Sequence, residues 1–329
     1  MKIKIGIAGY GNIGRGVEKA IRQNPDMELK AVFTRRNPQD LTIDTPGVSV
    51  YSLNDAEQLK KKNGVDIDVM ILCGGSAKDL PEQGPELASL FNTVDSFDTH
   101  AEIPKYLENM NKAAAGKNKT AVVSVGWDPG LFSIMRIISE AVFPDGTNYT
   151  FWGRGVSQGH SDAIRKIDGV KNAVQYTVPN ENAVDEVRRG TNPNLSVKQK
   201  HLRECYVVAK ENADIDRIEN EIKSMPHYFA DYDTVVNFIT EKELLKNHSK
   251  MPHAGFVFGS GNTGENKHIM EFSLKLDSNP EFTANILVAY ARAAYRMSKE
   301  GSFGAKTIFD VPLSYILPEN NSVTTKDLL

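Results

Sequence analysis

A glycine-rich turn near the start of the chain constrains the fold more than any other feature of the sequence. The segment GYGNIG, residues 9–14, directly follows an apolar strand that begins at residue 3, and it opens a helix predicted over 14–23. A strand, a GxGxxG turn and a helix in this order are typical of the phosphate-binding start of a doubly wound α/β domain. The first glycine permits the tight turn, the second lets a pyrophosphate approach the backbone, and the third lets helix and strand pack closely. A glycine turn that serves folding alone is the alternative.

The rest of the first third alternates short apolar strands with helices. Strands are expected at 29–33, 69–73, 93–95 and 121–125, and a helix at 104–115. Strands of this kind, buried on both faces and separated by helices, predict a Rossmann-type doubly wound parallel sheet.

After residue 127 the pattern changes to longer strands with more polar alternation. Few helices are expected between them, one of which is 215–224, and loose segments are expected at 182–196 and over about the last ten residues. The pattern predicts an α+β lobe with an open mixed or antiparallel sheet. The strands are expected at 149–153, 173–178, 202–209, 235–239, 256–258 and 269–276.

A helix predicted over 280–299 is rich in apolar residues, which suggests burial against the first sheet. Asn279 is a good N-cap, Pro280 suits the first helical position, and Gly301 lies just past the end. Placing this helix and the tail back on the first lobe gives a discontinuous domain, 1–126 with 278–329, and an inserted domain, 127–277.

Composition limits the partners and the compartment. Lys and Arg number 39 and Asp and Glu 42, a net charge of −3, which argues against nucleic-acid or anionic-membrane binding but not against a local cationic pocket. Cys73 and Cys205 lack metal-ligand spacing, so no metal is expected. The apolar start has the pattern of a strand rather than of a secretory segment, and no run approaches the roughly 18 apolar residues that cross a bilayer. A cytoplasmic protein with reduced thiols is expected.

The end of the second strand distinguishes between nicotinamide cofactors. An NAD enzyme usually places an acidic residue there to hold the ribose 2′-hydroxyl, but this chain has Thr34, Arg35 and Arg36, and no acid until Asp40. Two guanidiniums can grip a 2′-phosphate, and the threonine hydroxyl can add a further bond. Surface arginines without a ligand are the alternative, but the pair at this position predicts NADPH.

Two later strand ends face the same crevice, where cofactors bind in such folds. Residues 73–76 are small enough for a cofactor to lie against the backbone, and Cys73 is expected to be a packing residue because no base is signalled beside it. Asp95 and Asp98 lie at the other strand end, and Asp128 comes close behind it after the next strand. The three carboxylates form an acidic cluster that suits a substrate carrying an ammonium group. Asp95 as a helix cap and Asp128 as the start of a turn are the alternatives.

Several long motifs run through nearly the whole chain in a fixed order. They are GYGNIGR, TVDSFDTH, SVGWDPGLFS, FWGRGVSQGHSDA, AVQYTVP, RRG, MPHYF, MPHAG, LDSNPEFTA and DVPLSYILPEN. In these motifs the chain resembles the meso-diaminopimelate dehydrogenases, and WGRGVSQGHSDA makes the resemblance more specific than a shared Rossmann lobe. The resemblance implies an NADP-dependent homodimer of bacterial lysine and cell-wall precursor biosynthesis, with 127–277 as the substrate-binding and dimerisation domain.

The resemblance also implies roles for single residues. Asp98 and Asp128 would lie beside the D-configured amino centre, in a pocket shaped by Trp152, Gln158 and Gly159. The distal L-centre would be held by Thr177, Arg203, His253 and Asn279. The residue types fit, because Arg203 can clamp a carboxylate and Thr177 can add a hydroxyl bond. The alternatives are that His253 bonds only a backbone carbonyl and that Asn279 is only a cap. His160, in the motif SQGHSDA, is expected to be a structural hydrogen-bonding group and not a base.

The predicted cofactor-binding residues come from five strand ends. They are Gly9, Tyr10, Gly11, Asn12, Ile13, Gly14, Thr34, Arg35, Arg36, Cys73, Gly74, Gly75, Ser76, Ser96, Phe97, Asp98, Val125, Gly126, Trp127, Asp128 and Pro129.

The implied reaction is reversible oxidative deamination of the D-centre of meso-2,6-diaminopimelate. Its products are ammonia and L-2-amino-6-oxopimelate, and the latter cyclises to tetrahydrodipicolinate. Asp98 is the first candidate for the group that takes the ammonium proton, and a water held by Asp128 is the second. One rival interpretation is another NADPH-dependent reductase of the same pathway, such as dihydrodipicolinate reductase, whose site would have to be basic. The other is a non-catalytic NADPH-binding regulator, which would have no need of Asp98, Trp152 and Arg203 together.

Overall fold

The computed structural model describes residues 2–62 and 64–318. The chain divides into two compact units. The first unit comprises the described parts of Met1–Ile134 and Pro280–Leu329, and the second comprises Met135–Asn279. The chain passes from one unit into the other within α5 (Leu131–Val142) and at the first residue of α11 (Asn279–Lys299).

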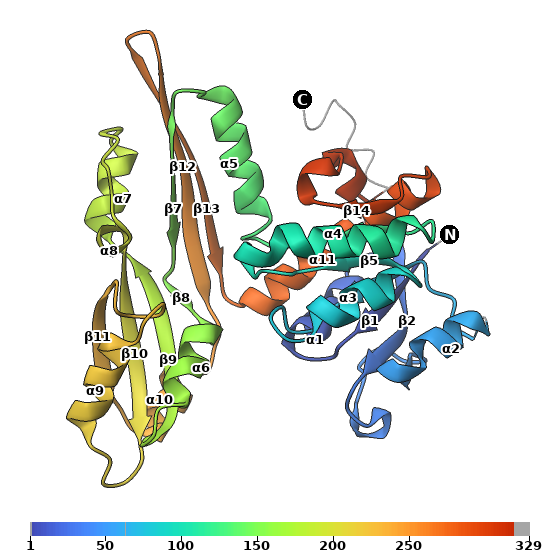
Figure 1. The fold of residues 1–329 in the computed structure, drawn as a ribbon, viewed down its shortest axis with the longest axis horizontal. Coiled ribbons are helices and arrows are strands. Elements are labelled where there is room, and N and C mark those ends of the chain that lie inside the picture. Colours follow the sequence, from blue (N-terminus) through green and yellow to red (C-terminus); the bar gives the residue numbers. More distant parts are fainter. Residues whose placement is uncertain (1, 63, 319–329) are drawn as a thin grey trace. The chain divides into compact units, whose positions relative to one another are not determined.

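A seven-stranded sheet, parallel throughout, forms the centre of the first unit (Figure 1). The strand order is β14-β6-β5-β4-β1-β2-β3, so the order reverses between β1 and β4, which is the switch point where doubly wound folds bind ligands. The predicted Rossmann-type fold class is therefore confirmed. The strands are β1 (Ile3–Ala8), β2 (Met27–Thr34), β3 (Ser49–Ser52), β4 (Val69–Leu72), β5 (Asn92–Asp95), β6 (Thr120–Val122) and β14 (Gly304–Lys306).

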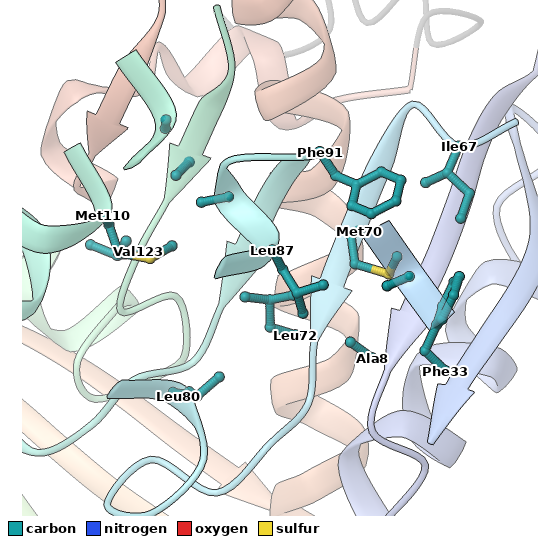
Figure 2. Close-up of a cluster of buried hydrophobic side chains, with 14 of the residues drawn as sticks. Ala8, Phe33, Ile67, Met70, Leu72, Leu80, Leu87, Phe91, Met110 and Val123 are labelled. Atoms are coloured by element: carbon teal, nitrogen blue, oxygen red, sulfur yellow. The ribbon is translucent and has the colours of Figure 1, made fainter. Parts of the chain in front are cut away.

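Helices α3 (Leu80–Ala88) and α4 (Ile103–Ala115) pack on one face of this sheet over a cluster of buried side chains. Figure 2 shows Leu87 of α3 beside Leu72 of β4, with Phe91 and Met70 in the same layer. Six short helical segments complete the connections of the first unit. They are α2 (Ala56–Lys61) and the 3₁₀ turns η1 (Pro38–Asp40), η2 (Leu53–Asp55), η3 (His100–Glu102), η4 (Ile308–Asp310) and η5 (Leu313–Ile316).

The helix α11 is fastened to the first unit by a buried arginine. Arg292 is only 2% exposed, and its guanidinium forms an ion pair with Asp26 at 2.6 Å and donates to Asn24 Oδ1 at 2.8 Å. Both partners lie in the turn between α1 (Asn12–Arg22) and β2. A chain segment that follows the whole second unit thereby becomes part of the first.

Two sheets build the second unit (Figure 1). In the four-stranded sheet, of order β11-β10-β9-β8, the β10–β11 pair is parallel and the other pairs are antiparallel. The three-stranded sheet, of order β13-β12-β7, is antiparallel. The predicted mixed or antiparallel lobe is confirmed, as two sheets instead of one. The strands are β7 (Thr147–Trp152), β8 (Gly155–Val156), β9 (Val170–Pro179), β10 (His201–Ala209), β11 (Asp233–Phe238), β12 (His253–Thr263) and β13 (Asn266–Leu276).

The second unit contains more helix than the sequence pattern predicted. The segment 182–196, expected to be loose, contains most of α7, whose Ala183, Val184 and Val187 are buried against Phe258 of β12. The prediction was wrong because this apolar stripe is only one turn long and is flanked by Asn, Asp and Glu. The other segment expected to be loose lies largely outside the described residues. The helices are α6 (Gln158–Arg165), α7 (Glu181–Arg188), α8 (Val197–Lys200), α9 (Ile215–Ser224) and α10 (Glu241–Asn247). Over the part of the chain that the structure describes, no helix is long and apolar enough to span a bilayer.

Candidate active site

The glycine turn has the geometry that a phosphate-binding turn requires. Gly9 has a φ of +93°, and a Cβ on Gly14 would lie 2.3 Å from the carbonyl oxygen of Gly9. In contrast, a Cβ on Gly11 would meet nothing within 4 Å, so the space in front of this residue is open. No side chain caps the N-terminus of α1, and its first turn contains no acidic residue. The turn therefore presents backbone N–H groups and the positive end of a helix to open space, which suits a pyrophosphate.

A cavity of about 560 Å³ lies at the carboxyl ends of β1, β2 and β4. Nine of the predicted cofactor-binding residues line it, together with Leu53, Asp79 and Gln83, which the sequence analysis missed. The nine are Gly9, Tyr10, Gly11, Thr34, Arg35, Arg36, Cys73, Gly74 and Gly75. The cavity sits at the switch point of the sheet, where this class of fold binds its cofactor.

The two arginines after β2 are held differently. The Arg36 backbone N–H donates to Thr34 Oγ1 at 3.1 Å, and its guanidinium donates to the carbonyl of Tyr10, which joins the arginine to the glycine turn. Arg35 forms an ion pair with Asp79 at 2.7 Å, and the same carboxylate accepts the N–H of Gly75 at 2.8 Å. Two guanidiniums at a cavity beside a phosphate-binding turn fit a dinucleotide with an additional phosphate on its ribose.

Asp95 does not belong to the acidic cluster in the way the sequence suggested. The side chain is fully buried and accepts hydrogen bonds from the N–H of Phe97 at 3.0 Å, the N–H of Ser124 at 3.2 Å and the hydroxyl of Tyr106 at 2.9 Å. Burial raises the pKa of Asp95 to about 6, although these three donors oppose the shift. Asp95 therefore ties together β5, α4 and the segment after β6, instead of facing a substrate.

The loop after β5 has an exposed acidic residue next to a buried ring. The Asp98 side chain is exposed, while its backbone N–H donates to Ser76 Oγ at 2.9 Å. This bond joins the predicted residues at the ends of β4 and β5. The Phe97 ring is buried and stacks on Tyr106 with ring centres 4.1 Å apart, so only the backbone of Phe97 can face a cofactor.

A tight loop follows β6 and carries Asp128, which is half-buried. A Cβ on Gly130, which has a φ of +140°, would fall 1.5 Å from the carbonyl oxygen of Gly126, so the loop closes on itself. The Trp127 ring packs edge-on against Phe132 of α5. The close approach of Gly130 to Gly126 thus constrains the backbone of this loop, and with it the position of the Asp128 Cα.

In the second unit, strand register brings three of the predicted distal residues together. Thr177 of β9 pairs with Arg203 of β10 on one side and with Gly155 of β8 on the other. The Arg203 guanidinium donates to Thr177 Oγ1. A Cβ on Gly155 would lie 2.4 Å from the His253 ring, so the imidazole occupies the space that a larger residue would fill. Arg203, Thr177 and Gly155 therefore lie in one row across the four-stranded sheet, and His253, from β12 of the other sheet, packs against the Gly155 end of that row.

The segment 251–253 links the remaining predicted residues of this unit. The Gln158 side-chain amide donates to the sulfur of Met251 at 2.8 Å, and the Asn279 N–H donates to the Met251 carbonyl at 3.0 Å. Gly159, next to Gln158 in the first turn of α6, has open space where a Cβ would project. The His253 Nδ1 lies within hydrogen-bonding distance of the Ala254 backbone, 2.9 Å from its oxygen. Gln158 and Asn279 therefore lie beside His253 through their contacts with Met251.

Two aromatic residues next to these positions were missed by the sequence analysis. His201 is buried, accepts the Trp152 backbone N–H at Nε2 at 2.8 Å, and stacks on the Trp152 ring with centres 5.3 Å apart. The ring of Tyr232 lies 3.8 Å from the guanidinium carbon of Arg203. No motif could have identified either residue. The register of β10 and β11 brings Tyr232 to Arg203, and the contact of His201 with Trp152 joins β10 to β7 of the other sheet.

Comparison with known proteins identifies the family. Sequence models match over residues 126–278 for the diaminopimelic acid dehydrogenase C-terminal domain and over residues 3–71 for the N-terminus of dihydrodipicolinate reductase. The meso-diaminopimelate D-dehydrogenase of Ureibacillus thermosphaericus is 60% identical over 329 residues, which covers 100% of this chain and 99% of that protein. The chain belongs to the meso-diaminopimelate D-dehydrogenase family. The enzyme of that name from Lysinibacillus sphaericus is 58% identical over 99% of both chains.

Solved structures of this family have the same fold along the whole chain. The diaminopimelate dehydrogenase of Corynebacterium glutamicum, in complex with diaminopimelate, has a TM-score of 0.91 at 46% identity, covering 100% of this chain and 99% of that one. An engineered D-amino acid dehydrogenase bound to NADP+ has a TM-score of 0.86 at 44% identity, covering all of both chains. The family predicted from the sequence motifs is confirmed, whereas the dihydrodipicolinate reductase model matches only part of the first unit.

Proposed function

We propose that this member of the family catalyses the NADP-dependent, reversible oxidative deamination of meso-2,6-diaminopimelate at its D-centre. The products are L-2-amino-6-oxopimelate, which cyclises to tetrahydrodipicolinate, and ammonia. The observation that carries the proposal is that Arg203 is buried without a counter-ion. The residue is only 7% exposed, and in the described part of the chain its guanidinium forms no ion pair with an acidic side chain. A buried cation without a counter-ion is costly, so the residue suits a site that receives a carboxylate.

The first unit is the cofactor domain in this proposal. The turn 9–14 receives the pyrophosphate, Thr34, Arg35 and Arg36 receive the 2′-phosphate, and the small residues 73–76 allow the cofactor to lie against the backbone. The remaining predicted positions, 96–98 and 125–129, contribute mainly backbone. Bound NADP+ supplies the hydride acceptor. The engineered relative bound to NADP+ supports this cofactor assignment.

Asp98 and Asp128 are assigned to the reacting D-centre. An ammonium group must lose a proton before or as the adjacent C–H bond is broken, and a carboxylate within reach can accept that proton. Asp98 is exposed and its backbone is fixed by Ser76, so it combines access with a defined position. Asp128 orients the ammonium group or the water that later releases ammonia. Trp152, Gln158 and Gly159 shape the pocket for the substrate chain.

The distal L-centre is assigned to Arg203, Thr177, His253 and Asn279. Only one orientation of the meso compound satisfies these groups while presenting the D-centre for oxidation. An unpaired buried polar group costs about 1–3 kcal/mol, so a few such contacts are sufficient to discriminate between the two ends.

Replacing Asp98 by asparagine is expected to lower kcat about 100-fold or more, because general-base catalysis contributes at least that factor. Because a general base is removed, the dependence of kcat on pH should change as well. The measurement is kcat as a function of pH, with Asp128→Asn as the matched variant. If Asp98→Asn raised only the KM for substrate and left kcat and its pH profile intact, the base would be Asp128 or its water.

We also propose that the enzyme is a homodimer formed through the second unit and that it acts in the cytoplasm. Ile137, Val142, Val235 and Ile269 are apolar residues of this unit that stay exposed in the single chain. Both thiols, Cys73 and Cys205, are free, as in proteins of a reducing compartment. Sedimentation equilibrium should give twice the chain mass of 36.4 kDa, whereas a mass of one chain at micromolar concentration would exclude the dimer.

A further inference from the structure

The environment of Arg203 has to stabilise a buried cation whenever no substrate is bound. The side chain is 7% exposed, and its Nε is buried without a hydrogen-bond partner. Its guanidinium donates to the hydroxyl of Thr177, which carries no charge. Burial lowers the pKa of Arg203 from its ordinary value, although a guanidinium stays protonated in proteins. A neighbouring group must therefore compensate the charge and hold the guanidinium plane.

The other titratable groups close to Arg203 do not supply a negative charge. Burial lowers the pKa of His160 to about 4 and that of His201 to about 3, and the nearby Arg203 lowers both further. Both imidazoles are neutral at pH 7 as a result. Cys205, two residues along β10, has its pKa raised to about 12 by burial and is a neutral thiol.

Tyr232 makes the one aromatic contact to Arg203 that the described residues provide. Its ring centre lies 3.8 Å from the guanidinium carbon. At this distance the face of an aromatic ring attracts a cation, and the attraction strengthens when the pair is shielded from water. A ring stacked on the guanidinium plane leaves the N–H groups at the edge of that plane available to a carboxylate.

A hydrogen-bonded turn before it and a strand after it fix the position of Tyr232. The residue directly precedes β11, whose Asp233 and Thr234 pair in parallel with Leu202 and Arg203 of β10. Its N–H donates to the carbonyl of Phe229 at 2.9 Å, and Phe229 is fully buried in the core under α6 and α9. The ring therefore has a defined place before any ligand binds.

We infer that Tyr232 is a positioning residue for the substrate: its ring holds the Arg203 guanidinium in the orientation that receives the distal carboxylate. The inference rests on the proposed function and adds a residue to it. Tyr232 acts through Arg203, so its removal affects binding of the distal end and leaves the chemistry at the D-centre unchanged. We attribute the effect mainly to the ring, whose centre lies 3.8 Å from the guanidinium carbon, although the Tyr232 hydroxyl also interacts favourably with the guanidinium.

Tyr232→Leu and Tyr232→Met test this inference, with Tyr232→Phe as the conservative variant. We expect the KM for meso-diaminopimelate to rise roughly tenfold in the Leu and Met variants, the size of a shielded cation–π contact, with kcat and the KM for NADP+ within about twofold of wild type. The Phe variant should have a KM within about twofold of wild type. Tyr295→Leu, which removes a ring next to the exposed Lys299 in the first unit, should change none of these constants.

A second measurement separates positioning from a general loss of structure. In an Arg203→Met background, Tyr232→Leu should cause no further rise in KM, since the guanidinium that the ring holds is gone. An unchanged KM in both Tyr232→Leu and Tyr232→Met, an equal loss in Tyr232→Phe, or fully additive effects with Arg203→Met would each overturn the inference. Absence of turnover of meso-diaminopimelate by the wild type would instead overturn the proposed function.

Discussion

Replacing Arg203 by methionine is expected to raise the KM for meso-diaminopimelate about 30-fold or more, because removing one partner of a buried charged hydrogen-bonded pair costs about 2–5 kcal/mol and each 1.4 kcal/mol is about a factor of ten. Methionine keeps an unbranched apolar chain in a site that is 7% exposed, so the fold should tolerate it. The measurement is steady-state kinetics with both substrates, in which the KM for NADP+ should stay within about twofold, because Arg203 lies outside the cofactor unit.

Arg217→Met is the matched control for this prediction. Arg217 is an exposed arginine of the same unit that pairs with Glu221 along α9, and an exposed pair of this kind contributes little. Its replacement should leave the KM for meso-diaminopimelate unchanged. An Arg203→Met variant with a wild-type KM would show that the distal carboxylate is held elsewhere.

Replacing Arg35 and Arg36 together by alanine is expected to lower kcat/KM for NADP+ about 100-fold or more, because a hydrogen bond to a charged group contributes about 1.5–3 kcal/mol and two guanidiniums are lost. The value for NAD+, which has no 2′-phosphate, should change only severalfold. The measurement is the ratio of kcat/KM between the two cofactors at fixed substrate concentration.

The control for the cofactor prediction is Arg22→Ala, an exposed arginine in the last turn of α1. This change alters the net charge of the same unit without touching the cavity, and the cofactor ratio should stay at the wild-type value. Equal losses with NADP+ and NAD+ in the double variant would mean that the two arginines support the glycine turn instead of reading the phosphate. That outcome is physically possible, because Arg36 donates a hydrogen bond to the Tyr10 carbonyl within the glycine turn.

The sequence predicted the first unit well where a single local pattern decides the structure. The GYGNIG turn, the apolar strands and the long helix α11 each have a periodicity or a spacing that only one local structure satisfies. Two strands were missed: β3 has no fully buried residue, and β14 is three residues long, so neither carries a measurable pattern. The amphipathic stripe of α7 was missed for a similar reason.

The candidate site was less predictable, because its contacts depend on register and on burial. From its residue type and its position in the sequence, Asp95 was expected to face the ammonium group of a substrate. Only the structure shows that its carboxylate is buried in the core, where it accepts hydrogen bonds from three donors. Asp79 was missed although it is close in sequence to the predicted segment 73–76, since nothing in the sequence indicates its pairing with Arg35. His201 and Tyr232 were identified only from the fold, which places His201 beside Trp152 and Tyr232 beside Arg203.

The central claim, NADP-dependent oxidation of the D-centre of meso-diaminopimelate, is tested most directly by following NADPH absorbance with purified protein and NADP+. The account predicts NADPH formation with the meso isomer, one ammonia released for each NADPH, and no signal with the LL isomer, which has no D-centre. Binding of NADP+ should be measured in the same preparation. No NADPH with the meso isomer in protein that binds NADP+, or an equal rate with the LL isomer, would contradict the account.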